Sequence, residues 1–195
     1  MSGTDTDVID ALVGITPGSA LDAIRARRPE ARAHAQATYQ ALFAPKDPGN
    51  VSASERFAVG VFVARLHGAT AVAAAYASGA PAALKEAVDT AVKEAKTRGP
   101  YGSYTPGPLS REDTPGPVYR MEASTRRALG PRLAAAFEHA HMLVFHPRDA
   151  APAALQALLD AGWTTTDIVT LSQIVAFLSF QIRVVAGLRT LAGRA

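Results

Sequence analysis

Alanine-rich stretches separated by proline and glycine are the feature that most constrains the fold of this 195-residue chain. Alanine makes up about a fifth of the residues and has the highest intrinsic helix propensity of any residue type. No strong alternation of apolar and polar residues, the pattern of a half-buried strand, interrupts these stretches. The sequence therefore predicts an all-α fold, and a chain of this length can bury a core as a single domain.

Capping and helix-breaking residues divide the chain into separate helices. Ser19 can cap one helix, and the sequence Ser52-Ala-Ser-Glu55 matches a capping box at the start of a long apolar helix. Gly99 and Pro147 each follow a periodic segment and are typical stop signals. We expect helices over residues 8–14, 21–28, 30–43, 52–77, 81–98, 132–146, 151–161 and 164–191, with helical structure also resuming near residue 122.

The segment from Gly99 to Pro117 differs from the rest of the chain. It is dominated by glycine and proline, shows no periodicity, and carries Tyr101 and Tyr104, with Tyr119 just beyond it. A loop of this length in a compact domain is usually a lid, a binding loop or a subunit-contact arm. A disordered linker is the alternative, although such linkers are usually poor in aromatic residues.

The two halves of the chain contain similar segments. Leu42-Phe-Ala-Pro-Lys-Asp47 corresponds to Val144-Phe-His-Pro-Arg-Asp149, and each precedes a capped apolar helix. The pattern predicts two related helical units, and chance similarity between two alanine-rich segments is the alternative. Within one domain over 1–195 we expect N-terminal helices over 1–50, a first core unit over 51–98, a loop over 99–119 and a second core unit over 120–195.

Composition excludes several classes of function. The net charge is only +3 and the basic residues form no stripe, so we expect no nucleic-acid partner. The acidic N-terminus does not resemble a secretory signal, and the longest apolar stretch, residues 168–180, is short for a bilayer. We therefore expect a cytoplasmic protein with no membrane association. The chain has no cysteine, which excludes disulfides, cysteine-based metal sites and a thiol nucleophile.

Two helices resemble those of a known superfamily. Ser54-Glu-Arg-Phe-Ala-Val-Gly-Val-Phe-Val-Ala-Arg-Leu-His-Gly-Ala69 resembles the signature helix of the carboxymuconolactone decarboxylase / AhpD-like alkylhydroperoxidase superfamily. Asp167-Ile-Val-Thr-Leu-Ser-Gln-Ile-Val-Ala-Phe, with Arg183, resembles the C-terminal helix of its peroxidase-related members. The resemblance implies an AhpD-like helical fold and a homo-oligomer, either a dimer or a hexamer built as a trimer of dimers.

The chain departs from the superfamily pattern at every position of the thiol chemistry. Phe57 replaces the family's proton-relay glutamate, Ala69 and Val72 replace the two cysteines, and Tyr76 replaces the histidine. A thiol peroxidase needs a reactive thiolate and a resolving thiol. The resemblance therefore implies a degenerate or ligand-binding homologue with a small-molecule ligand and no cofactor. The alternatives are a cysteine-independent decarboxylase-type enzyme using acid/base residues, or a structural partner of a cysteine-bearing paralogue.

Three candidate site residues lie in or near the first signature helix. Glu55 is an acid that could act in a pocket or simply complete the capping box. Tyr76 could bind a ligand or act as a weak acid, or it could be a core aromatic residue. His67 stands where the family usually has asparagine, and it could line the same pocket or lie at a backbone kink.

The remaining candidates lie in the second half. Glu138-x-x-His141 has the spacing found in di-iron bundles, but the chain has only one copy of that motif. His139 and His146 are seven residues apart, about 10 Å along a helix, so we expect no metal site. Arg183 is the only charged residue between Asp167 and Arg189. We expect it to be buried, either paired with Glu138 or Glu122 or clamping an anionic ligand with Gln173.

Overall fold

The structure, a computed structural model, describes residues 6–193, so residues 1–5 and 194–195 of the predicted outer units lie outside the described residues. Over this range the chain is all-helical and contains no strand, which confirms the predicted fold class. The α-helices are α1 (Val8–Val13), α2 (Ala20–Ala26), α3 (Pro29–Phe43), α4 (Ala53–Leu66), α5 (Thr70–Ala77), α6 (Lys85–Glu94), α7 (Ala123–Leu129), α8 (Pro131–Phe145), α9 (Pro152–Asp160) and α10 (Thr165–Ala192). Short 3₁₀-helices are η1 (Ala82–Leu84), η2 (Pro108–Glu112) and η3 (Pro147–Asp149).

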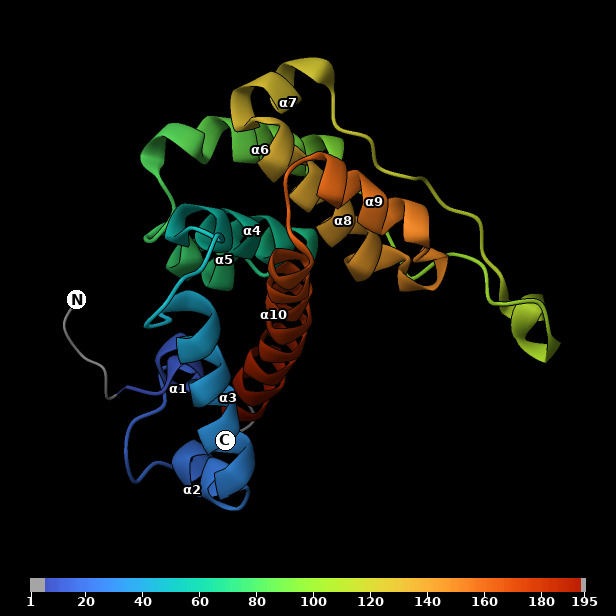
Figure 1. The fold of residues 1–195 in the computed structure, drawn as a ribbon. Helices are drawn as coiled ribbons and strands as arrows, with labels where there is room; N and C mark the ends of the chain where they lie inside the picture. Colours follow the sequence, from blue (N-terminus) through green and yellow to red (C-terminus); the bar gives the residue numbers. More distant parts are fainter. Residues whose placement is uncertain (1–5, 194–195) are drawn as a thin grey trace.

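The longest helix, α10, runs through the middle of the molecule and connects two groups of helices (Figure 1). The N-terminal helices α1, α2 and α3 pack against α10 toward its C-terminal end. Helices α4, α8 and α9 pack against α10 nearer its N-terminus, and α6 and α7 extend that group outward. Helix α4 therefore packs against both α8 and α10 at the centre of the second group.

Aromatic and alanine side chains form the core between α4 and α8. The rings of Phe62 and Phe137 stack with their centroids 4.1 Å apart and an interplanar angle of 12°. Ala64 and Ala136, on the same two helices, are completely buried. Alanine therefore favours the helices intrinsically and also leaves room for large rings between them.

The predicted helix over 52–77 is wrong in one respect, because the structure breaks it into α4 and α5. Gly68 adopts a left-handed conformation with φ +69°. The Ala69 amide donates to the Ala64 carbonyl at 2.9 Å and the Gly68 amide donates to the Arg65 carbonyl at 2.9 Å, which is a Schellman motif. Only glycine adopts this backbone conformation without strain, so Gly68 ends the first helix.

The helix predicted over 81–98 is also shorter than expected. Residues 82–84 form the 3₁₀-helix η1, and α6 ends at Glu94, five residues before Gly99. Ala95, Lys96 and Arg98 follow Glu94 and favour a helix intrinsically, so the sequence contains no stop signal before Gly99. The early end lets the chain turn toward the loop over 99–119, which we call the arm.

The arm leaves the helical body and returns to it, with η2 at its far end (Figure 1). At its base, Tyr101 is buried, and its amide donates to the Phe145 carbonyl at 2.9 Å. Gly102 and Thr114 form an isolated antiparallel bridge that holds the two sides of the arm together. The base of the arm is therefore fixed to the end of α8.

The two similar sequence segments have similar backbone structure at the ends of their helices, although only the second continues into a 3₁₀-helix, η3. Helices α3 and α8 each have 15 residues, and each begins with proline and ends with phenylalanine. The residues that follow, Ala44 and His146, have φ/ψ of −140°/46° and −144°/56°. Both segments lead into a helix with a capping box, at Ser52 and at Thr164, and the second segment carries the additional helix α9.

Helix α10 is long and apolar enough, by length and composition alone, to cross a membrane. Half of its most apolar 18-residue window is buried against the rest of the chain. Burial of this kind is also found in the core helix of a soluble protein, and it leaves the other half of the window without a cover.

One arginine links the starts of α4, α8 and α10. Arg132 Nε donates to Glu55 Oε1 at 2.7 Å, and its Nη2 lies 3.4 Å from Asp167 Oδ2. Its guanidinium lies 4.1 Å from the centroid of the Trp163 ring, and the Trp163 indole donates to the Arg132 carbonyl at 2.9 Å. Glu55 and Asp167 are also the acids of the two capping boxes, so one side chain connects both caps.

Replacement of this arginine is expected to weaken the whole fold. Arg132→Ala should lower the free energy of unfolding by about 2 kcal/mol, because it leaves two carboxylates and a tryptophan face without their partner. Urea denaturation monitored by circular dichroism measures this loss. Arg127→Ala on the exposed side of α7 is the matched control and should change stability by less than about 0.5 kcal/mol. Equal losses in the two variants would contradict the role of Arg132.

Candidate functional site

Packed side chains occupy the positions that the resemblance would assign to thiol chemistry. Tyr76 is 3% exposed, and its hydroxyl donates to Gln181 Oε1 at 2.8 Å. Its ring lies 4.7 Å from Phe43 and 6.2 Å from Phe57, centroid to centroid. A Cβ added at Gly79 would lie 2.5 Å from the Phe57 ring, so that ring is packed directly against the backbone.

The two positions that replace the cysteines are apolar. Val72 is buried, and Ala69 lies just before the first turn of α5. Burial raises the pKa of Tyr76 well above its ordinary value, so its hydroxyl stays protonated and keeps donating to Gln181. Tyr76 is therefore a core aromatic residue in this structure, which was one of the two alternatives.

Glu55 serves as a cap rather than facing a pocket. Its carboxylate accepts from the Ser52 amide at 2.8 Å, and Ser52 Oγ accepts from the Glu55 amide at 3.2 Å. The second carboxylate oxygen accepts from Arg132. Both carboxylate oxygens are thus bound within the fold.

His67 and Arg183 lie near each other but do not form a buried clamp. His67 is the last residue before the helix break, and its Nε2 lies 3.2 Å from Ser179 Oγ on α10. Burial and the nearby Arg183 lower the pKa of His67. The prediction that Arg183 is buried is wrong, because its side chain is exposed and donates to the Ser179 carbonyl at 2.6 Å.

The two proposed carboxylate partners of Arg183 are engaged or located elsewhere. Glu138 forms an ion pair with Arg126 and accepts from the Met121 amide at 2.8 Å. Glu122 is an exposed residue that precedes α7. Arg183 projects from the exposed side of α10. This single charge within an apolar stretch of sequence therefore needs no buried partner.

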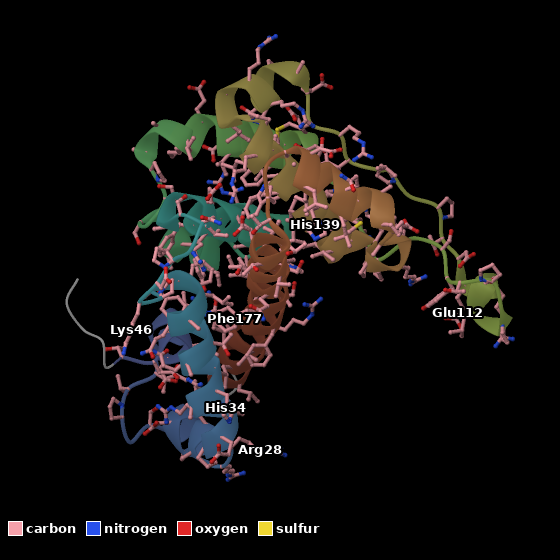
Figure 2. The ribbon with its side chains drawn as sticks, in the orientation of Figure 1. Arg28, His34, Lys46, Glu112, His139 and Phe177 are labelled. Carbon is pink, nitrogen blue, oxygen red and sulfur yellow. The ribbon has the colours of Figure 1, made fainter. Side chains whose placement is uncertain are left out.

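A second group of the predicted residues lines a cavity of about 240 Å³, which we call the histidine pocket. The pocket lies between α8, α9 and the end of the arm, and Figure 2 labels His139 on α8 near the crossing with α10. Most of its lining is small and apolar, with a few polar side chains. The lining residues are Val118, Tyr119, Arg120, Ala135, Glu138, His139, Met142, His146, Asp149, Ala151, Ala153, Ala154 and Ala157.

His146 and Asp149 form a hydrogen-bonded pair in the wall of this pocket. His146 Nδ1 lies 3.0 Å from Asp149 Oδ2, and the Ser103 amide donates to Asp149 Oδ1 at 2.9 Å. The His146 ring stacks on Tyr101 with centroids 5.0 Å apart and an angle of 14°. Three residues at the base of the arm, Tyr101, Gly102 and Ser103, contact this pair; a Cβ at Gly102 would lie 2.9 Å from the carboxylate.

Three imidazoles in this region each have one ring nitrogen that is buried without a hydrogen-bond partner. The atoms are His139 Nδ1, His141 Nδ1 and His146 Nε2. His139 Nε2 lies 3.3 Å from Ser172 Oγ, which holds that ring against α10. Buried polar atoms without partners are uncommon in folded proteins, so these positions require an explanation.

His141 lies behind the pocket rather than in it. Its ring packs 5.1 Å from Tyr119, 4.9 Å from Phe145 and 5.6 Å from His146. Burial, with a smaller contribution from His146, lowers its pKa to about 4, and burial lowers the pKa of His139 as well. Both imidazoles are therefore neutral near pH 7.

The sequence did not predict the pair in the pocket wall. His146 was expected on the same helix face as His139 but about two helical turns away, too far to act with it. In the structure His146 is the residue that ends α8, and its φ/ψ of −144°/56° let it line the same cavity as His139. The sequence His146-Pro-Arg-Asp149 was a detectable signal, because a three-residue spacing within a turn brings a histidine and an aspartate together.

The predicted residues therefore separate into different places in the fold. Tyr76, Glu55, His67 and Arg183 do not converge on one cavity, whereas His139 lines the histidine pocket. Within residues 6–193, no cluster of three or more histidine, aspartate or glutamate residues could hold a metal ion. Comparisons of the chain with protein-family models, curated proteins and solved structures give no match.

The buried histidines should make stability depend on pH. A histidine whose folded pKa lies below its unfolded value stabilises the fold above pH 6.5, and that stability is lost as the pH falls through the folded pKa. For His141 the loss should run from about pH 6.5 to about pH 4. His141→Phe should reduce the slope by up to about 1.4 kcal/mol per pH unit in urea unfolding series.

The exposed histidine on α3 provides the control for this measurement. His34→Gln should leave the pH slope unchanged, because the side chain is 78% exposed. If the wild type and His141→Phe show the same slope of unfolding free energy against pH, His141 binds its proton equally well in the folded and unfolded states. That result would contradict the lowered pKa of His141 in the folded state.

Proposed function

We propose that this chain is an AhpD-like protein without the redox cysteines, and that it binds a small molecule in the histidine pocket. The observation that carries the proposal is the pair of buried, unpartnered nitrogens, His139 Nδ1 and His146 Nε2, on residues that line one cavity. Largely apolar pockets with a few placed polar groups are the usual form of small-molecule sites.

The proposal places ligand binding away from the superfamily's thiol position. The contacts of Tyr76 with Phe43, Phe57 and Gln181 support this choice, because they leave that position filled. The two similar segments, α3–α4 and α8–α10, support the proposed two-unit AhpD-like arrangement. We further propose a cytoplasmic location, in keeping with a chain that carries no cysteine.

A cysteine-independent decarboxylase-type enzyme is the second candidate function. The Asp149–His146 pair favours it, because a carboxylate that orients a histidine is a common arrangement for general acid/base catalysis. A structural partner of a cysteine-bearing paralogue is the third candidate, and the filled thiol position favours it.

Peroxide consumption tests the loss of thiol chemistry. With hydrogen peroxide and a dithiol reductant, the purified protein should consume peroxide no faster than the reductant alone, because no thiolate is available. A buffer blank and a protein sample unfolded in urea are the controls. Turnover well above both in metal-free protein would contradict the proposal of a degenerate peroxidase.

Filling the histidine pocket tests small-molecule binding. The probes are 4-fluorophenol, 4-fluoroanisole and 4-fluorobenzoate, observed together by ¹⁹F NMR. At least one resonance should broaden with the wild-type protein, and Ala154→Phe, which places a ring in the cavity, should abolish the broadening. Ala33→Phe on the exposed side of α3 should bind as the wild type does. No broadening of any resonance would contradict binding in this pocket.

We also propose that the chain forms a homo-oligomer through the uncovered side of α10. Phe180 is 46% exposed and Val169 is 55% exposed on this helix. Phe180 and Phe177 line an open, mostly apolar groove between α3 and α10, and Figure 2 labels Phe177 there. An uncovered apolar surface on a core helix is typical of a subunit interface.

Light scattering coupled to size-exclusion chromatography tests the oligomer. The wild-type protein should elute at a multiple of its 20.3 kDa chain mass, and Phe180→Asp should shift it toward the monomer. Leu155→Asp on α9 is the matched control, because Leu155 is 47% exposed but lies away from the groove. A monomeric wild-type protein would contradict the proposed assembly.

A further inference from the structure

We infer that the histidine pocket recognises an uncharged small molecule through a weakly acidic hydroxyl group of the phenol class, which donates a hydrogen bond to His146 Nε2. This inference rests on the proposed function and specifies the chemistry of its ligand.

The hydrogen-bond partners of His146 decide which polar group the ligand must present. An ionised carboxylate can only accept hydrogen bonds, so His146 Nδ1 carries the proton that it shares with Asp149 Oδ2 at 3.0 Å. In the neutral imidazole the other nitrogen, Nε2, then has a free lone pair and can only accept. Nε2 is buried and has no partner, so a donor on the ligand would satisfy it.

The acceptor is held in place before a ligand binds. The Tyr101 ring stacks on one side of the imidazole and the His141 ring meets it edge-on at 5.6 Å. Asp149 is held in turn by the Ser103 amide at 2.9 Å. A fixed acceptor loses little conformational entropy on binding, which favours recognition of a single donor group.

The charged groups of the pocket already have partners, which favours an uncharged ligand. Glu138 pairs with Arg126 and lies 3.7 Å from Arg120, and the Asp149 carboxylate accepts hydrogen bonds from His146 Nδ1 and from the Ser103 amide. Arg120 is 74% exposed, so its charge is largely hydrated rather than directed into a buried site. A carboxylate ligand would find no unpaired cation among the described residues that line the cavity.

The walls of the pocket suit a flat apolar body. Five of the lining residues are alanines, four of them within or just before α9, and Met142 and Val118 complete the apolar surface. Methionine and alanine side chains leave room for a ring and contact it by dispersion. His139 Nδ1, the second unpartnered nitrogen of the lining, can bond a further polar substituent.

Comparison of matched fluorinated probes tests this inference. Dissociation constants of 4-fluorophenol and 4-fluoroanisole are measured separately by ¹⁹F NMR. The two probes share the fluorinated ring and its oxygen, and the anisole has a methyl group in place of the hydroxyl proton, so it cannot donate a hydrogen bond. We expect the phenol to bind about tenfold more tightly or better, the value of one well-placed hydrogen bond in a buried site. The ¹⁵N resonance of His146 Nε2 should shift on addition of the phenol and stay unchanged with the anisole.

Variants separate recognition from folding. His146→Phe keeps a ring in the stack on Tyr101 but removes the acceptor, so it should bind the two probes equally. Asp149→Asn tests the positioning residue and should reduce the preference for the phenol while leaving anisole binding unchanged. His34→Gln is the control and should keep the full preference, and thermal melting checks that each variant is folded.

The remaining outcomes would contradict either the inference about the ligand or the proposed function itself. Equal binding of phenol and anisole to the wild type, or a preference for 4-fluorobenzoate, would overturn donor recognition while leaving the proposed small-molecule pocket intact. Retention of the phenol preference in folded His146→Phe would also overturn it. Failure of all three probes to bind would remove the proposed function itself.

Discussion

The rest of the fold depends on one guanidinium group at the meeting point of three helices. Arg132 lies in the first turn of α8 and bonds the capping acids of α4 and α10. Those acids also bond the amides of their own caps, so the charge of Arg132 stabilises both helix starts through the same carboxylates. Trp163 covers the guanidinium and is 2% exposed. Arg132 therefore holds the starts of α4 and α10 together at the start of α8.

The residues that follow α3 and α8 differ in their chemistry. The residue that follows each helix has nearly the same backbone conformation, but it is Ala44 after α3 and His146 after α8. In the first unit Asp47 accepts from the Gly49 amide at 2.9 Å, which is an ordinary turn contact. In the second unit the equivalent Asp149 faces an imidazole. The second unit therefore differs from the first by an imidazole–carboxylate pair at this position and by helix α9, which lines the candidate site.

Much of the helical structure could be predicted from local chemistry. Ser19, Ser52 and Thr164 bond the amides that their capping patterns require, and Gly14 ends α1 in the left-handed conformation. The break at Gly68 could not be predicted in the same way, because residues on both sides of it favour a helix equally well. A lone glycine within an alanine-rich segment costs little, so only tertiary packing decides whether the helix continues.

The candidate site was harder to predict, because it depends on which side of α10 is covered and on where α8 ends. Because its neighbours in the sequence are apolar, Arg183 was expected to be buried. It lies instead on the exposed side of α10, one turn after the exposed Phe180. His146 was excluded from a shared site with His139 because of the distance between them along a helix, but that helix ends one residue before His146. Hydropathy alone could not show that α10 has an uncovered side, since only packing reveals which side the other helices leave free.

The arm described above consists of two parts with different tolerance to change. Its base, from Tyr101 to Ser103 with Thr114 opposite, is tied to the histidine pocket by backbone hydrogen bonds and a stacked ring. Its far end, around Pro108 and Leu109, projects from the body and is exposed. Insertions or deletions between Thr105 and Arg111 would change the outline of the molecule without altering the pocket. The far end of the arm therefore tolerates changes of length that its base does not.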